Sequence, residues 1–504
     1  MKEYLKDLPL PLWEEHPEYQ EFYLKAWELA HDHIKEVPGL PQTPYMDEAF
    51  CDTQIWIWDT CFMTLFCKYA PKIFPGVESL RNFYDVLYGG KNMPLIVPTE
   101  REPAWTHKPQ GIPTEMQIHL ADNPPLFAWA EYENALMIGD PDHLRRLLYR
   151  DQPLQKHYEW LENLKEKTKP SCVHASTYWV AEEYGYRWEG GRSGMDNTPR
   201  GRTGDHATAP RPQNPDQLWL DAICQQALSA QMIAKLFGLL KDTENEKIWR
   251  ARFAEKQSVI NELYWDAEDE FYYDIHCDTH AHMKVMSIAS YWALTAEVAT
   301  PERAAALAKL IDDPATFGGP VPFPSLSRSD NDYCAEGCYW RGSVWLPTAY
   351  AALRGLKNYG YHRENHLASR KLLEHMYRTY QEVEPHTIWE CYAPEQPRPA
   401  TTEHGAGTQV RKDFCGWSAL GPIAVYIEFV LGFHTVNAFT RTVEWALPET
   451  AGRIGIRNLR FGDVVTDIEA CNGTCTVVSN RAYTLIINGT SHKINPGENR
   501  IKGV

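Results

Sequence analysis

The sequence has no long hydrophobic run and no leader-like start. No uninterrupted apolar stretch approaches the roughly 20 residues that cross a bilayer, and the first residues show no apolar core followed by a small-residue cleavage site. These absences predict a protein without a membrane partner and favour a cytoplasmic location.

Positive charge is also scarce. The chain of 504 residues holds 50 Lys and Arg against 67 Asp and Glu, which gives a formal net charge of −17. Because so acidic a surface would repel nucleic acid and anionic lipid, we expect neither as a partner. A small neutral ligand is the better expectation.

Closely paired metal-type cysteines are missing as well. The 12 cysteines include no Cys-x-x-Cys pair, and the only close pairs are Cys334 with Cys338 and Cys471 with Cys475. Several of the others lie in apolar helical patterns, where a thiol packs as a small hydrophobic group. We therefore expect reduced cysteines with a mainly structural role.

Aromatic residues, in contrast, are abundant: 18 Trp, 27 Tyr and 17 Phe. The flat apolar faces and polar edges of Trp and Tyr suit sugar rings as well as they suit a protein core. This composition permits a carbohydrate ligand but does not by itself indicate one.

Apolar residues recur with the period of a helix in about twelve segments up to residue 433. The links between these segments alternate between short and long, and the long ones are 37–55, 90–123, 169–213, 265–285, 313–339 and 384–412. Six helical hairpins closed in a ring would bring all six long links to one end. The pattern predicts a mainly α fold, an (α/α)6 barrel over residues 1–435, with the active site at that end.

The pattern changes after Gly432 to short runs of β-forming residues separated by turn signals. Asn488-Gly489, between two such runs, is a strong signal for a two-residue hairpin. Residues 436–504 are therefore predicted to form a small antiparallel β domain.

The long links contain clusters of aromatic, carboxylate and glycine residues at 54–63, 189–201, 339–350, 389–395 and 413–420. In this order they resemble the inverting glycosidase clan of trehalases, processing α-glucosidase I (glycoside hydrolase family 63) and bacterial mannosylglycerate hydrolases. Each motif alone is weak, but five in order are specific. The resemblance implies an exo-acting, inverting hydrolase that releases a terminal α-linked hexose, foremost glucose, without a cofactor.

The resemblance also implies the two catalytic carboxyl groups. Asp196, in a Ser-Gly-x-Asp-x-x-x-Arg segment, matches the general acid, and Glu390, in a Glu-x-Tyr segment, matches the general base. Glycoside cleavage needs such a pair in any case, because one carboxyl protonates the leaving oxygen while the other activates the nucleophile. We expect partial desolvation in an aromatic-rich loop to keep Asp196 protonated. Glu395 and Glu403 are rival bases.

Other positions match sugar-binding residues of the clan. Asp59 is expected to accept hydrogen bonds from sugar hydroxyls, although a carboxylate at a helix N-terminus is the alternative interpretation. Arg341 either binds substrate or forms a structural ion pair. Trp340 and Trp345 lie five apart at the start of one predicted helix, so one should stack on sugar and the other should pack. The expected substrate-binding residues are Trp58, Asp59, Asn123, Gly194, Arg200, Tyr339, Trp340, Arg341, Trp345, Tyr392 and Trp417.

A histidine cluster superficially suggests a metal site. His276, His280 and His282 lie near Asp274 and Asp278, but their spacing is irregular and the expected chemistry requires no metal. We expect no metal here.

Two other functions remain open. A carbohydrate-binding protein that has lost catalysis is one, although the presence of both carboxyls argues against it. A sugar epimerase or isomerase on the same ring of helices is the other, with four candidate proton carriers: His119, His206, His386 and His404. Met195 and Cys391 depart from the clan pattern, so trehalose, other glucobioses and glycosylated small acids all remain candidate substrates. The sequence also leaves the oligomeric state open, a homo-oligomer included.

Overall fold

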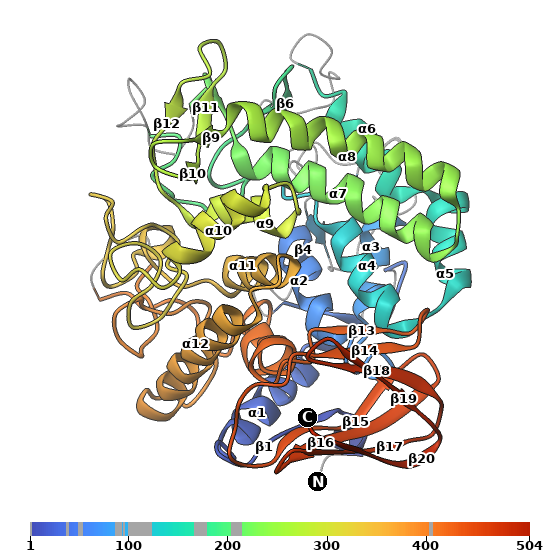
Figure 1. Cartoon of the computed structure of the whole chain (residues 1–504). Coiled ribbons are helices and arrows are strands. Elements are labelled where there is room, and N and C mark those ends of the chain that lie inside the picture. The colour runs from blue at the N-terminus through green and yellow to red at the C-terminus, as the bar shows by residue number, and fades with distance from the viewer. Residues whose placement is uncertain are drawn as a thin grey trace.

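The computed structural model describes residues 3–36, 40–48, 54–85, 93, 96–98, 123–165, 179–202, 214–402 and 407–504. The chain is mainly helical, and its longer strands gather near the C-terminal end (Figure 1). The predicted combination of a mainly α region with a C-terminal β region is therefore confirmed. In the described part of the chain, no helix is both long and apolar enough to span a membrane.

The helices lie where the apolar period predicts them. Their bounds are α1 Tyr19–Asp32, α2 Ile57–Cys67, α3 Gly76–Tyr84, α4 Phe127–Ile138, α5 Pro141–Arg145, α6 Pro153–Glu162, α7 Leu220–Leu239, α8 Thr243–Leu263, α9 Trp292–Thr295, α10 Pro301–Leu310, α11 Leu346–Asn358 and α12 His362–Glu382. Two π-helices, η3 Arg146–Asp151 and η9 Gly421–Val430, and four 3-10 turns, η1 Glu3–Lys6, η6 Ile288–Tyr291, η7 Tyr339–Arg341 and η8 Ser418–Leu420, complete the helical elements of the described residues.

Six of these helices contact one another in a closed series. The series runs from α2 to α4, α7, α9, α11 and η9, and η9 contacts α2 again. Every residue of α2 and η9 is buried, whereas Trp249 and Ile260 are the buried residues of α8, which packs outside on α7 (Figure 1). Burial on all sides is typical of an inner helix, and burial along one stripe is typical of an outer one.

The C-terminal strands form two sheets. Their bounds are β13 Thr435–Asn437, β14 Thr442–Trp445, β15 Ile454–Phe461, β16 Val464–Cys471, β17 Thr474–Ser479, β18 Tyr483–Ile487, β19 Thr490–Ile494 and β20 Gly497–Lys502. Pairing within these sheets is antiparallel except between β14 and β18, which run parallel. Asn488 and Gly489 have φ of +47° and +83°, so the predicted hairpin between β18 and β19 is confirmed.

The N-terminal residues differ from the predicted division of the chain. Strand β1 (Leu10–Trp13) pairs with β15 at the edge of the five-stranded sheet β1-β15-β16-β17-β20. A segment that the sequence places in the helical unit thus completes the C-terminal sheet, and Trp13 is buried there.

The long links carry short strands of their own. They are β2 Ile34–Lys35, β3 Tyr45–Met46, β4 Gln54–Trp56, β5 Ile96–Pro98, β6 Val180–Ala181, β7 Tyr186–Arg187, β8 Gln217–Leu218, β9 Trp265–Asp266, β10 Phe271–Tyr272, β11 Asp274–His276 and β12 His282–Met283. Backbone pairing of this kind fixes the described parts of the links, so side chains at the starts of the inner helices are held in defined positions.

Candidate active site

Three carboxyl groups, one from the start of α2 and two from different links, lie close together. Burial raises the pKa of Asp59 well above its ordinary value, and the charges of Glu390 and Asp196 raise it further. Burial also raises the pKa of the Tyr339 hydroxyl, and the same two charges add to that effect. Such mutual effects require proximity, so the fold brings together four residues that the sequence separates by up to 331 positions.

Glu390 is held by several donors although only 1% of it is exposed. The Tyr339 hydroxyl donates to Oε1 at 3.0 Å, and Arg411 Nη1 donates to the same oxygen at 3.1 Å. The backbone N–H of Arg411 donates to Oε2 at 3.1 Å. Three donors fix the direction of this carboxylate, as a general base requires.

The backbone carbonyl of Glu390 is fixed as well. It accepts hydrogen bonds from Trp417 Nε1 at 2.8 Å and from the Ser418 hydroxyl at 3.0 Å. The predicted residue Trp417 therefore reaches the site from the start of η8 and positions the carboxylate through its main chain. Trp417 is 6% exposed, so its ring also contributes to the packed wall.

Asp196 lies on a compact turn that follows Trp188. Ser193 Oγ donates to the carbonyl of Gly190 at 2.8 Å, and the N–H of Met195 donates to the same oxygen at 3.1 Å. The Asp196 side chain is exposed, in contrast to the buried residues 197–200 that follow it. The partial desolvation expected from its own loop is therefore absent around this carboxyl.

The backbone of Gly194 lies directly against the ring of Trp58. Gly194 has φ of +83°, and a Cβ there would lie 3.2 Å from three atoms of the Trp58 ring. Glycine is thus required both by the left-handed backbone and by the close ring. The two predicted residues form one wall beside Asp196, in which Trp58 is further packed by Phe62 at a ring distance of 4.8 Å.

Asp59 combines burial with a carboxylate that accepts a hydrogen bond from its own backbone N–H. It is 6% exposed, and within the described ranges no side chain donates a hydrogen bond to it. Its neighbour Glu48 is fully buried, accepts from the N–H of Trp56 at 2.8 Å, and has a pKa raised by burial and by the charge of Asp59. A buried carboxyl with open acceptor positions suits the hydroxyl groups of a sugar.

The expectation for Trp340 and Trp345 is wrong. Their rings stack on each other at 4.2 Å with an angle of 2° between planes, and both residues are 1% exposed. They can face each other because Trp340 belongs to the turn η7 and not to α11, which begins only after Trp345. Neither ring is free to stack on a sugar in this arrangement, and Tyr392, 0% exposed, is likewise a packing residue.

Two arginines predicted to bind substrate are engaged elsewhere. Arg200 is 2% exposed, and its guanidinium donates to both carboxylate oxygens of Asp221 and of Asp274 at 2.6–2.9 Å. Arg341 donates to the backbone carbonyl and the carboxylate of Asp332 at 3.1 and 3.3 Å, on the surface. Arg341 thus follows the ion-pair alternative, although its partner is exposed and not buried.

Asn123 is buried at 7% exposure. Its Oδ1 has no hydrogen-bond partner in the described part of the chain. A buried amide oxygen without a partner is costly and is compatible with the expected contact to a ligand.

The rival bases and proton carriers that are described lie in other surroundings than the carboxyl cluster. Glu395 accepts hydrogen bonds from Arg328 Nε at 2.7 Å and from the Tyr333 hydroxyl, and so belongs to another cluster. His386 is half-exposed and bonds to the carbonyl of Tyr380 at 2.7 Å. Glu403 and the other proposed proton carriers lie outside the described residues, namely His119, His206 and His404.

The histidine cluster is dispersed in the fold. Asp274 pairs with Arg200, and His282 lies 3.2 Å from a carboxylate oxygen of Asp266. Among the described residues, one group gathers several metal-type ligand atoms within 4.8 Å of one another, and it consists of His276, Cys277 and Asp278. His276 Nδ1 there already accepts from the N–H of Asp278 at 3.1 Å.

The expectation for one cysteine pair is wrong. Cys334 and Cys338 form a disulfide, while Cys471 and Cys475 are free. The disulfide closes the turn directly before Tyr339, in which Cys338 and Tyr339 both have positive φ. The sequence spacing alone gives no sign of this turn.

Comparison with known proteins identifies the class. Residues 54–406 match the family described as mannosylglycerate hydrolase MGH1-like glycoside hydrolase domain. This range contains both candidate catalytic carboxyls and covers most of the chain. The chain therefore belongs to this family of glycoside hydrolases.

Individual relatives agree with this assignment. An uncharacterised protein of Borreliella burgdorferi is 27% identical over 355 residues, covering 69% of this chain and 67% of the relative. The mannosyl-oligosaccharide glucosidase of Saccharomyces cerevisiae is 24% identical over 298 residues, covering 53% of this chain but 33% of that enzyme. The chain thus spans about two thirds of the first relative and a third of the second.

Among solved structures, the GH63 mannosylglycerate hydrolase of Thermus thermophilus in complex with glucose superposes with a TM-score of 0.58. It is 19% identical and covers 80% of this chain and 99% of its own. At this identity the similarity establishes the fold.

Sequence reasoning missed three residues of the site. Arg411 and Asn197 hold the loops of the candidate catalytic carboxyls, and Glu48 lies near Asp59. Asn197 directly follows Asp196, so a polar neighbour of a candidate catalytic residue was a usable signal. For Arg411 and Glu48 the sequence offers none.

Proposed function

We propose that the protein is an exo-acting, inverting glycoside hydrolase in which Asp196 is the general acid and Glu390 the general base. The observation that carries this proposal is the set of three donors that fixes the carboxylate of Glu390 beside Asp59 and Asp196. Water activated by Glu390 would attack the anomeric carbon while Asp196 protonates the departing oxygen. Asp196 would become desolvated when a bound sugar covers its exposed side chain.

The substrate we propose is a small glycoside with a terminal α-linked hexose, foremost glucose. Support comes from the buried carboxyl of Asp59 beside the Trp58 ring, which together offer acceptors and an apolar face. The glucosidase among the relatives and the glucose complex among the solved structures also support it. In this proposal Asn123 supplies a further polar contact, through its unpaired amide oxygen.

We further propose that the closed series of six inner helices is an (α/α)6 barrel and that residues 1–435 carry the chemistry. The contacts from α2 around to η9, with other helices packed outside, support this architecture. The starts of α2 and α11 and the turn η8 all contribute to the site, which supports an active site at one end of the ring. Residues 436–504 would then form a second unit, completed by β1.

The test compares the wild type with Asp196→Asn and Glu390→Gln on a panel of α-linked disaccharides and glycosyl-glycerates. Proton NMR identifies the anomeric form in which the sugar is first released. Glu395→Gln is the matched control, because Glu395 is a glutamate of the same link that is bound by Arg328. Circular dichroism verifies that each variant is folded.

The proposal expects release of the inverted anomer by the wild type and by Glu395→Gln. The Asp196→Asn and Glu390→Gln variants should lose activity by at least about 1,000-fold, because each removes a group acting in the transition state. Release of the retained anomer would contradict the mechanism. Interconversion of free sugars without cleavage would favour an isomerase, and binding without turnover a lectin-like protein.

A further inference from the structure

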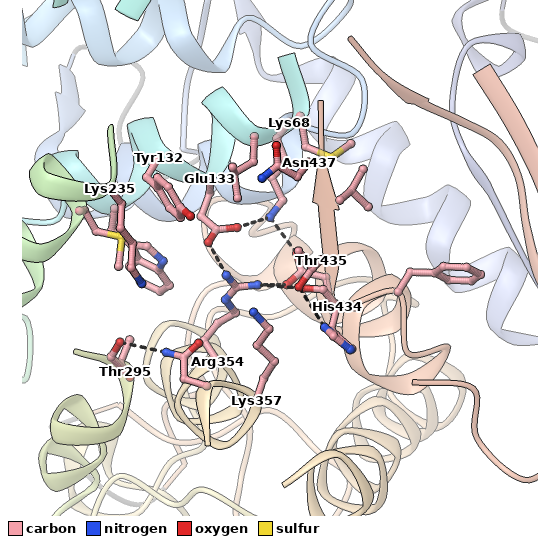
Figure 2. A pocket seen from close by; sticks show the side chains of 18 of the residues that line it. Lys68, Tyr132, Glu133, Lys235, Thr295, Arg354, Lys357, His434, Thr435 and Asn437 are labelled. Atoms are coloured by element: carbon pink, nitrogen blue, oxygen red, sulfur yellow. Dashed lines mark hydrogen bonds and ion pairs between the residues drawn. The ribbon is translucent and has the colours of Figure 1, made fainter. Parts of the chain in front are cut away.

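A polar cavity of about 120 Å³ lies between Lys68, Glu133 and Arg354 (Figure 2). Lys68 directly follows α2, whereas Asp59 of the carboxyl cluster lies near the start of the same helix. Its wall includes Lys68 after α2, Glu133 of α4, Arg354 and Lys357 in the last turns of α11, and Glu428 of η9. With a rise of about 1.5 Å per residue, Lys357 lies roughly 17 Å along α11 from its start at the active-site end. The cavity is therefore separate from the catalytic site.

The cavity wall carries four cationic side chains and three carboxylates: Lys68, Lys235, Arg354 and Lys357 against Glu133, Glu297 and Glu428. Lys68 Nζ lies 2.9 Å from both Glu133 and Glu428, and Arg354 pairs with the same two glutamates. Burial alone would raise the pKa of Glu133, but Arg354 and Lys68 outweigh this and lower it to about 2. Both carboxylates are thus committed to two cations.

The remaining carboxylate is also taken. Glu297 lies 2.6 Å from Lys235 Nζ. Three of the four cations are therefore neutralised by the three carboxylates, and the charge that is left over is that of Lys357.

Lys357 has no ion-pair partner within 4.0 Å in the described part of the chain, and Figure 2 shows its side chain beside Arg354 without a marked interaction. Burial lowers the pKa of Lys357 to about 8, and repulsion by Arg354 contributes to this. Glu133, which is already paired with Lys68 and Arg354, and Glu444, from a position that is 40% exposed, act in the opposite direction and more weakly than burial. A partly buried ammonium without a partner within 4.0 Å is unfavourable unless an anion lies beside it.

The lowered pKa of His434 also indicates an excess of positive potential in the cavity. Burial, with repulsion by Lys357, His362 and Arg354, lowers the pKa of His434 to about 2. The imidazole is therefore neutral and does not add charge. The negative ends of the inner-helix dipoles offset part of the field, which explains why cations gather here but not why one of them stays unpaired.

We propose that this cavity binds one small inorganic anion, which pairs with the ammonium of Lys357 next to Arg354. The excess of one positive charge matches a single-charged ion, and the volume has room for chloride or for a tetrahedral oxyanion and for little more. The anion would tie α11 to α4 and η9. It is a structural ligand, and the site is independent of the proposed glycosidase activity.

The experiment measures the melting temperature of the full chain while chloride or phosphate replaces gluconate at constant ionic strength and neutral pH. We expect a saturable rise of about 2–4 °C in the wild type, because a ligand that binds only the folded state stabilises it. Lys357→Met should show no rise, while Lys247→Met, an exposed lysine of α8, should respond as the wild type does. The ion that saturates at the lower concentration is the occupant.

Equal melting temperatures of the wild type in gluconate, chloride and phosphate would overturn the proposal, as would a full response of Lys357→Met. If Lys357→Met does not fold, crystals of the wild type soaked in bromide decide the question. An anomalous peak beside Lys357 Nζ supports the site, and its absence from the cavity overturns it.

Discussion

The side chain of Asn197 bonds to the backbone N–H of Trp340, which donates to Oδ1 at 2.7 Å. Asn197 Nδ2 donates in turn to the carbonyl of Cys338 at 3.0 Å. These two bonds span Tyr339, whose hydroxyl donates to Glu390, so one amide connects the loop of the proposed acid with the loop that orients the proposed base. Asn197 is therefore a positioning residue for the distance between the two carboxyls.

The Asn197→Ala variant should lose turnover while it still binds substrate. Removing two hydrogen bonds, of which the one to Trp340 is buried, would let the loops separate, and a loss of about 1.4–2.7 kcal/mol in transition-state stabilisation lowers kcat about 10–100-fold. KM should change little, because Asn197 does not contact the sugar in our proposal. Steady-state kinetics on the best substrate measures this split.

Asn499→Ala provides the control for that variant. Asn499 bridges two groups of Asn495 with its amide in the same manner, but in the β domain. If kcat of Asn197→Ala equals that of Asn499→Ala, the bridge does not position the carboxyls.

The Tyr339→Phe variant should lower kcat and leave KM near the wild-type value. The lost hydroxyl is one of three donors that orient the carboxylate of Glu390, and the loss of such a bond costs about 1.5–3 kcal/mol. Steady-state kinetics should therefore show kcat lower by about 10–150-fold. Tyr333→Phe removes the corresponding donor to Glu395 and should leave kcat unchanged. A kcat that falls only in Tyr333→Phe would make Glu395 the base.

Local patterns predicted much of the fold, because helix period and turn residues are properties of neighbouring residues. The helical segments up to residue 433 and the hairpin at Asn488 were predicted for this reason. The pairing of β1 with β15 was not, because it joins Leu10 to Arg457, and no local signal reports so distant a partner.

The lack of local signals for distant partners also explains which site residues could be predicted. Asp196, Glu390 and Asp59 lie inside recognisable motifs, and the structure brings their side chains together. The role of Arg200 depends on Asp221 and Asp274, 21 and 74 residues away, so its motif alone suggested a substrate contact.

The Arg200→Met variant should therefore act on stability. It leaves the buried carboxylates of Asp221 and Asp274 without their shared cation, which typically costs about 3–5 kcal/mol. Urea unfolding should show this loss, while KM of the remaining folded enzyme stays near the wild-type value. Arg378→Met, which breaks an exposed pair with Glu382, should cost about 0–1 kcal/mol. A large rise in KM at unchanged stability would restore Arg200 as a binding residue.

The Asp59→Asn variant should be more stable than the wild type at neutral pH and far less active. Burial and the charges of Glu390 and Asp196 raise the pKa of Asp59 in the folded protein above its unfolded value. The folded state therefore binds this proton more tightly, and the wild type loses stability as pH rises from the unfolded pKa towards the folded one. Asparagine carries no such proton, so the difference in melting temperature between variant and wild type should grow with pH.

Thermal unfolding at a series of pH values from acid to neutral tests this expectation. The difference in melting temperature should be near zero at acid pH, where Asp59 is protonated in both the folded and the unfolded protein. It should reach about 2–4 °C at neutral pH. Asp312→Asn, an exposed position on the surface, should show no such trend. If Asp59→Asn instead melts below the wild type at neutral pH, the carboxylate of Asp59 is stabilising, and like-charge repulsion does not govern this site.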